Sequence, residues 1–337
     1  MKAVGYYETG PIDRKDALVD LEIDKPAPEG RDLLVKITAV SVNPVDTKIR
    51  QRRAPEGGAA DILGWDAVGE VAQVGADAGL FQPGDMVYYA GAIDRPGTNA
   101  EYHLVDERIV GRKPANLSNT EAAALPLTTL TAYEMLFDRL RVNDPVPGAA
   151  PAVLIIGGSG GVGSIAIQLL RATTDITVIA TASRPETQSW VKELGAHHVI
   201  DHSQSLVEQI EALGIGQPGF VFSTTHTDSY IEQIAELIAP QGRFGLIDDP
   251  VNLDIASLKP KSTSIHWEFM YTRSLFGTSD VARQHDILTH TTDLVEAEKI
   301  RSTATQTMGK IDAATLMRAH ALIETNTARG KIVLEGF

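Results

Sequence analysis

The chain has 337 residues, of which 43% are hydrophobic, and its 44 acidic against 30 basic side chains give a formal net charge of -14 at pH 7. This length predicts about two domains, and the acidic balance disfavours nucleic acid as a partner because phosphate backbones would be repelled. The chain contains no cysteine, which excludes disulfides, iron–sulfur clusters, a thiolate nucleophile and cysteine-ligated zinc.

Residues 1 to about 125 consist of short strand-like runs separated by Gly, Pro and Asp, the clearest being 33–37, 67–74 and 85–89. Strands at this spacing predict a β-rich domain. The amino terminus lacks the pattern of a secretory signal peptide, and no run reaches the ~18 apolar residues of a membrane span. We therefore expect a cytoplasmic protein that makes no membrane contact.

The pattern changes at residues 121–126, after which the sequence predicts a helix to about residue 138. From about residue 150, apolar strands alternate with helices, which is typical of a parallel sheet wrapped by helices. The predicted strands are 152–156, 176–180, 198–200, 219–222 and 242–247, and the helices are 162–172, about 185–194 and about 228–238. After about residue 265 the pattern loosens, and it ends in a helix over about 312–327 and a strand over 331–334. We predict an α/β domain over 126–265 that interrupts a β-rich domain of residues 1–125 and 266–337.

A glycine-rich loop joins the first strand of the α/β domain to its helix. Gly158, Gly160 and Gly163 form a Gly-x-Gly-x-x-Gly pattern, which permits a tight turn, close approach of backbone to a pyrophosphate and close packing of helix on strand. The helix amino terminus adds free N–H groups for the phosphates. We predict dinucleotide binding by this loop, including Ser159, Gly161 and Val162; the alternative is a turn that merely links strand and helix.

The residues after the second strand of this domain indicate which dinucleotide binds. An NAD-specific fold places an acidic side chain here, on the ribose 2′-OH, whereas this chain has Ser183 and Arg184. A hydroxyl and a guanidinium favour a 2′-phosphate, so the sequence favours NADP(H) over NAD(H). The alternative is that Arg184 is a solvated residue at the start of a helix.

Several segments, taken in order, give the chain a resemblance to the medium-chain dehydrogenase/reductase superfamily. They are residues 41–46, 63–69, 81–87 and 125–133, the glycine loop, and 330–334. The sequence looks most like the zinc-free NADPH:quinone oxidoreductase branch, often labelled zinc-type alcohol dehydrogenase-like. This resemblance implies an α/β fold, a GroES-like β-rich catalytic domain interrupted by a Rossmann domain with a doubly wound parallel sheet, and a homodimer joined across a Rossmann sheet edge.

The resemblance also allows a comparison with zinc-dependent relatives, which place a Cys ligand in the first segment and Gly-His-Glu in the second. Here these positions hold Asn43 and Gly64-Trp65-Asp66. A zinc site needs at least three convergent ligands, and Asp46 with Asp66 would not supply them, so we predict no metal. Because a Lewis acid favours alcohol oxidation at neutral pH by acidifying the hydroxyl, as zinc does in the relatives, we expect hydride transfer from NADPH to a quinone or an α,β-unsaturated carbonyl instead, with hydrogen bonds receiving the charge on oxygen.

The resemblance implies three catalytic residues. Asn43 would donate to the acceptor carbonyl, or alternatively form a turn before Pro44. Lys48 stands where similar reductases often have Tyr and could stabilise an enolate-like oxygen, or be solvated. Trp65 would form an apolar wall of the acceptor pocket, or pack in the core. Asp46 could orient its neighbours, or cap a helix.

The resemblance and the positions at strand ends imply further cofactor contacts besides Asn43, the glycine loop, Ser183 and Arg184. These are Thr131, His202, Ser223, Leu246, Ile247, Phe269, Met270 and Lys331. Two other functions remain open: a dinucleotide-binding sensor or partner-binding protein without catalysis, and a zinc-dependent alcohol dehydrogenase, which the residues oppose.

Overall fold

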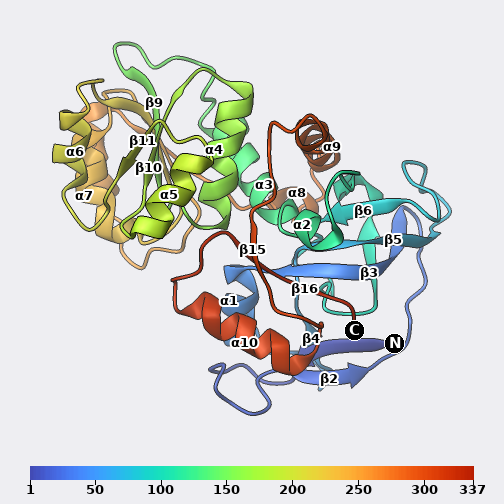
Figure 1. Cartoon of the computed structure of the whole chain (residues 1–337). Helices are drawn as coiled ribbons and strands as arrows, with labels where there is room; N and C mark the ends of the chain where they lie inside the picture. Colours follow the sequence, from blue (N-terminus) through green and yellow to red (C-terminus); the bar gives the residue numbers. More distant parts are fainter. The chain divides into compact units, whose positions relative to one another are not determined.

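The computed structural model describes all 337 residues and divides them into two compact units (Figure 1). One consists of Met1–Leu130 with Tyr271–Phe337, and the other of Thr131–Met270. The predicted α/β fold with an inserted parallel-sheet domain is therefore confirmed. The insertion begins and ends five residues later than the 126–265 that we expected. No helix is both long enough and apolar enough to cross a bilayer.

The β-rich unit contains two sheets. Its seven-stranded sheet has the order β15-β16-β3-β5-β6-β8, with β7 paired to β3. These strands are β3 (Asp32–Val42), β5 (Ala67–Val74), β6 (Met86–Tyr89), β7 (Tyr102–Asp106), β8 (Val110–Arg112), β15 (Ala304–Thr307) and β16 (Lys331–Glu335). The smaller sheet has the order β2-β1-β4, formed by β1 (Lys2–Tyr6), β2 (Val19–Glu22) and β4 (Asp61–Ile62).

The long strand β3 organises the larger sheet, because it pairs antiparallel with β5, β7 and β16. Its pairing with β16 joins the carboxyl-terminal segment to the amino-terminal one, with Val42 opposite Ile332 and Ser41 opposite Val333. Helices of this unit are α1 (Pro44–Arg52), η1 (Glu107–Ile109), α2 (Asn119–Ala123), most of α3 (Pro126–Tyr133), α8 (Thr272–Leu275), α9 (Arg283–Glu296) and α10 (Ala313–Glu324).

The inserted unit is a six-stranded parallel sheet with the order β11-β10-β9-β12-β13-β14. The strands are β9 (Ala150–Ile156), β10 (Thr177–Thr181), β11 (His198–Ile200), β12 (Pro218–Ser223), β13 (Arg243–Leu246) and β14 (Ser264–Trp267). The helices are η2 (Glu134–Arg139), α4 (Gly161–Thr173), α5 (Pro185–Glu193), α6 (Leu206–Ala212), α7 (Thr227–Leu237) and η3 (Ile255–Lys261). Figure 1 shows α4 and α5 lying across the strands β9 to β11.

The core of the inserted unit follows from its sequence pattern. Strand β9 is central and its residues 152–156 are all apolar and buried, as expected for a parallel strand covered on both faces. Helix α7 contributes Ile231, Ile234 and Leu237 to the same cluster, at the 3.6-residue period of a helix with one buried face. This packing places the carboxyl ends of β9, β10, β12 and β13 together at one sheet edge.

Candidate active site

The glycine loop lies between β9 and α4, as the sequence predicts. A Cβ on Gly163 would lie 2.4 Å from the Gly157 carbonyl oxygen, and one on Gly158 would lie 2.8 Å from the Ala180 Cβ. These glycines therefore let α4 and β10 pack closely against the loop. Gly160 begins α4 in extended geometry without a side-chain cap, so the first turn presents backbone N–H groups that suit a pyrophosphate. Ser159, Gly161 and Val162 are half-buried in the same loop and first turn.

The strand register brings further expected contacts to this edge of the sheet. Ser223, at the end of β12, lies opposite both Ile156 of β9 and Leu246 of β13. Ser223 is buried and its hydroxyl is 2.8 Å from the Thr227 hydroxyl. Ile247 follows Leu246 and is half-buried. Ligands bind at this edge in open parallel sheets, so the fold fits a dinucleotide here.

Basic side chains follow the ends of β10, β11 and β12. Arg184 is exposed and its Nε lies 3.1 Å from Glu186 Oε1, so part of its charge is already balanced. His202 is half-buried and its pKa is lowered, first by burial and also by the nearby charges of His226 and Arg184. Its Nδ1 is buried without a hydrogen-bond partner. Ser183 precedes Arg184 and is half-buried. The end of the second strand thus carries the Arg184 guanidinium and the Ser183 hydroxyl, and the end of the third strand carries the His202 imidazole.

The remaining expected cofactor residues of this unit lie at its two ends. Thr131 is buried in α3, at the first position of the unit. Phe269 is 47% exposed, whereas Met270 is buried. Their roles stay predictions.

In the β-rich unit, Asn43 and Asp66 belong to a buried polar cluster. Asn43 Nδ2 donates to Asp66 Oδ2 at 2.8 Å, and the Asn43 Oδ1 accepts from the Lys331 ammonium. The Lys331 Nζ also lies 3.1 Å from Asp66 Oδ2. Ser41 Oγ donates to Asp66 Oδ2 at 2.9 Å, and the Leu127 backbone N–H donates to Asp66 Oδ1 at 2.8 Å. These polar groups thus meet inside the protein rather than at its surface.

Burial opposes charge in this cluster. It raises the pKa of Asp66 and lowers that of Lys331, while their mutual attraction acts against both shifts. Because the carboxylate and the ammonium are in direct contact and Asp66 accepts three further hydrogen bonds, we take the pair as ionised. The sequence named Lys331 as a cofactor contact and missed its pairing with Asp66. Only the Gly330–Leu334 motif pointed to this segment.

Asp46 joins the same cluster from α1. Its Oδ2 accepts from the Asn43 backbone N–H at 2.5 Å, which is the helix-capping role that the sequence left open. Its Oδ1 is buried without a hydrogen-bond partner. Burial raises the pKa of Asp46 to about 7.

Trp65 lies inside the β-rich unit with 1% of its surface exposed. Its indole N–H donates to the Ala92 carbonyl at 3.1 Å, and its ring meets the edge of Tyr271 at a centroid distance of 6.4 Å. The Arg53 guanidinium lies 5.7 Å from the indole ring. Lys48 is half-buried on α1. The sequence did not single out Tyr271 as a neighbour of Trp65.

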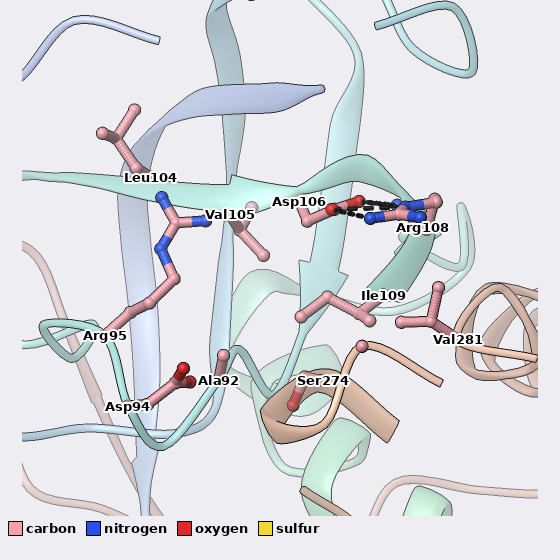
Figure 2. A pocket seen from close by; sticks show the side chains of 11 residues that line it. Ala92, Asp94, Arg95, Leu104, Val105, Asp106, Arg108, Ile109, Ser274 and Val281 are labelled. Carbon is pink, nitrogen blue, oxygen red and sulfur yellow. Dashed lines mark hydrogen bonds and ion pairs between the residues drawn. The ribbon is translucent and has the colours of Figure 1, made fainter. Parts of the chain in front are cut away.

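A separate cavity of about 120 Å³ in the β-rich unit contains none of the expected site residues. Figure 2 shows Asp106 and Arg108 in its wall, joined by an ion pair. Arg95, also in the wall, binds both carboxylate oxygens of Asp32 at 2.8 Å. Because none of the expected site residues lines this cavity, we do not include it in the candidate site.

The chain matches two family descriptions, an alcohol dehydrogenase GroES-like domain over residues 29–115 and a zinc-binding dehydrogenase over residues 161–284. It is 40% identical over 336 residues to a zinc-type alcohol dehydrogenase-like protein of Staphylococcus aureus (strain MSSA476), covering 99% of each chain.

Two solved structures extend the likeness. A Rhizobium etli CFN 42 protein, described as belonging to the zinc-dependent alcohol dehydrogenases, is 60% identical and superposes with a TM-score of 0.99 over 100% of this chain and 98% of that one. A quinone oxidoreductase of Coxiella burnetii is 27% identical, with a TM-score of 0.80 over 100% and 99%.

Proposed function

The chain belongs to the medium-chain dehydrogenase/reductase superfamily of oxidoreductases with an NAD(P)H-binding fold, and on this premise we propose that it reduces quinones or α,β-unsaturated carbonyls with NADPH and without a metal. The observation that carries the proposal is the environment of Asp66. Its carboxylate is fully engaged by Lys331, Asn43, Ser41 and the Leu127 N–H.

The side chains here do not fit the zinc that the comparisons name. No group of three His, Cys, Asp or Glu side chains is arranged to hold a metal ion, and a zinc site requires at least three such ligands besides water or substrate. Asp66 already binds an ammonium, and Trp65 has no atom that binds zinc. We therefore derive no step through zinc.

The inserted unit fits NADPH. The close approach at Gly158 and Gly163 and the uncapped start of α4 would hold its pyrophosphate. Ser183, Arg184 and His202 would receive the 2′-phosphate, which supports NADPH over NADH. When bound, NADPH supplies the hydride.

The acceptor class follows from what the residues provide. Hydride addition to a quinone or an enone places negative charge on an oxygen, which hydrogen-bond donors can stabilise without a Lewis acid. Asn43, Lys48 and Trp65 remain our candidates for positioning the acceptor. The whole-length likeness to the Coxiella burnetii quinone oxidoreductase supports the same class.

The test is NADPH oxidation with a panel of 1,4-benzoquinone, an enone, an aldehyde and, in the reverse direction, an alcohol. We expect turnover with the quinone or the enone, tighter binding of NADPH than of NADH, and no change of rate with a metal chelator. Tight NADPH binding without turnover of any acceptor would instead favour the non-catalytic sensor. Alcohol oxidation that appears only when Zn²⁺ is added would favour the zinc-dependent dehydrogenase.

A further inference from the structure

We propose that Lys331 is a positioning residue whose buried ammonium fixes the amide of Asn43. The proposal rests on the proposed reductase function only for its effect on turnover, because the fixed amide itself can be observed without a substrate. It gives Lys331 a role different from the cofactor contact that the sequence predicts.

The fold brings Lys331 to Asn43 through the register of two strands. Lys331 is the first residue of β16, and its neighbour Ile332 lies opposite Val42 of β3. The side chain is 4% exposed. Its Nζ contacts the Val42 carbonyl at 3.0 Å, Asn43 Oδ1, and Asp66 Oδ2 at 3.1 Å. An ammonium has three N–H donors, so all of them are used within this unit and none is left for a cofactor phosphate.

This arrangement allows only one orientation of the Asn43 amide. Its Oδ1 faces the ammonium and its Nδ2 faces the Asp66 carboxylate. A flip would place the amide N–H₂ against an N–H donor of the ammonium and the amide oxygen against a carboxylate, and both contacts would be repulsive. The ammonium and the carboxylate therefore fix the orientation of the amide. The same ammonium also donates to the Val42 carbonyl, just before α1.

The Asp66–Lys331 pair orients the Asn43 amide and adds little to the stability of the fold. A buried ion pair gains little over apolar side chains, whereas removal of one partner leaves an uncompensated charge. Asp66 Oδ2 also accepts from Ser41, and Oδ1 from the Leu127 N–H, so the carboxylate is itself held in place. The pair thus fixes Asn43 within a rigid frame built from β3, β16 and α3.

The experiment compares Lys331→Met, the charge-neutral double variant Asp66→Asn/Lys331→Met, and Lys36→Met as a control on an exposed lysine of β3. The single variant should lose thermal stability, because Asp66 is left unpaired. The double variant should regain stability, with little change in KM for NADPH. Its kcat should stay about 100-fold below that of wild type, the loss expected when the Asn43 amide is displaced by about 1 Å. Lys36→Met should match wild type. A double variant that regains both stability and kcat would show a merely structural role and overturn the proposal.

A second comparison does not need the single Lys331→Met variant, which leaves Asp66 unpaired and can fold poorly. In an Asn43→Ala background, replacing Asp66 and Lys331 should change kcat by less than about twofold, since the amide that they hold is already gone. An equally large loss in that background would contradict positioning through Asn43.

A third measurement separates this proposal from the proposed function. The side-chain amide protons of Asn43, assigned in NMR spectra by their loss in Asn43→Ala, should exchange slowly in wild type and much faster in the double variant. If wild type turns over no acceptor, the proposed function fails while this exchange still tests the positioning. Unchanged exchange in the double variant would overturn the positioning alone.

Discussion

Asp46 is a buried carboxyl whose charge should change with pH near neutrality. It is buried beside Asp66, Lys331 and Tyr271, and only its Oδ2 has a hydrogen-bond partner. Burial is the largest effect and raises its pKa to about 7, against the attraction of Lys331 and the N–H groups of Asn43 and Gly64. The folded protein therefore binds a proton that the unfolded chain has already lost above its ordinary pKa of 3.8.

This difference predicts that Asp46 lowers stability as pH rises. Between about pH 4 and pH 7 the folded state holds more protons than the unfolded state, so the free energy of unfolding should fall by at most about 1.4 kcal/mol per pH unit. Asp46→Asn keeps the hydrogen-bond acceptor but does not ionise. Urea unfolding of both proteins at several pH values should show that the free energy of unfolding of the variant rises relative to that of wild type up to about pH 7. Parallel stability profiles would show that Asp46 does not titrate in this range.

At the scale of elements, the sequence predicted the bounds of helices and strands best where a few neighbouring residues define the element. Strand β9, the glycine loop and α4 come within two residues of their expected bounds, because apolar runs and glycines carry the signal within a few positions. Helix α9 was not predicted, since its buried face includes the polar Gln284, Thr291 and Thr292. Thr292 is satisfied by the Arg112 carbonyl at 2.6 Å, a partner 180 residues away that periodicity cannot reveal.

Replacing Gly163 or Gly160 of the glycine loop by alanine should have different effects on stability. Gly163→Ala should destabilise the loop, because its Cβ would lie 2.4 Å from the Gly157 carbonyl oxygen and 2.6 Å from the Gly158 Cα. Gly160→Ala should fold normally, since its nearest neighbour would be 3.6 Å away and its φ of −72° suits any residue. If backbone approach to the pyrophosphate requires Gly160, this variant should still lose NADPH affinity by at least about tenfold.

Thermal melting and NADPH titration of the two variants check this pair. We expect a lowered melting temperature for Gly163→Ala alone and weakened binding for both. Wild-type affinity in Gly160→Ala would mean that a cofactor does not contact the loop at this position.

At the scale of the whole molecule, the resemblance gave the interrupted domain order, while the candidate site depended on contacts between distant segments. Asn43 was recognised from its motif, but its partner Lys331 lies 288 residues away. No spacing or periodicity pairs such residues; the register of β16 on β3 does. The insertion starts later than expected because α3 runs across the division between the units, so the change in sequence pattern near residue 125 precedes the structural boundary.

The exposed edge of the parallel sheet at β14 is where we expect two copies to associate. Strand β14 lies at the end of the sheet order, so one of its sides offers unpaired backbone groups, and its Trp267 is 57% exposed. A second copy could pair with the same edge about a twofold axis and cover this side chain. We expect light scattering at micromolar concentration to give the mass of a dimer, and Trp267→Lys to give a monomer. Phe276→Lys, which changes a 74% exposed aromatic of the other unit, should remain dimeric. A monomeric wild type, or equal loss of the dimer in both variants, would rule out pairing through β14.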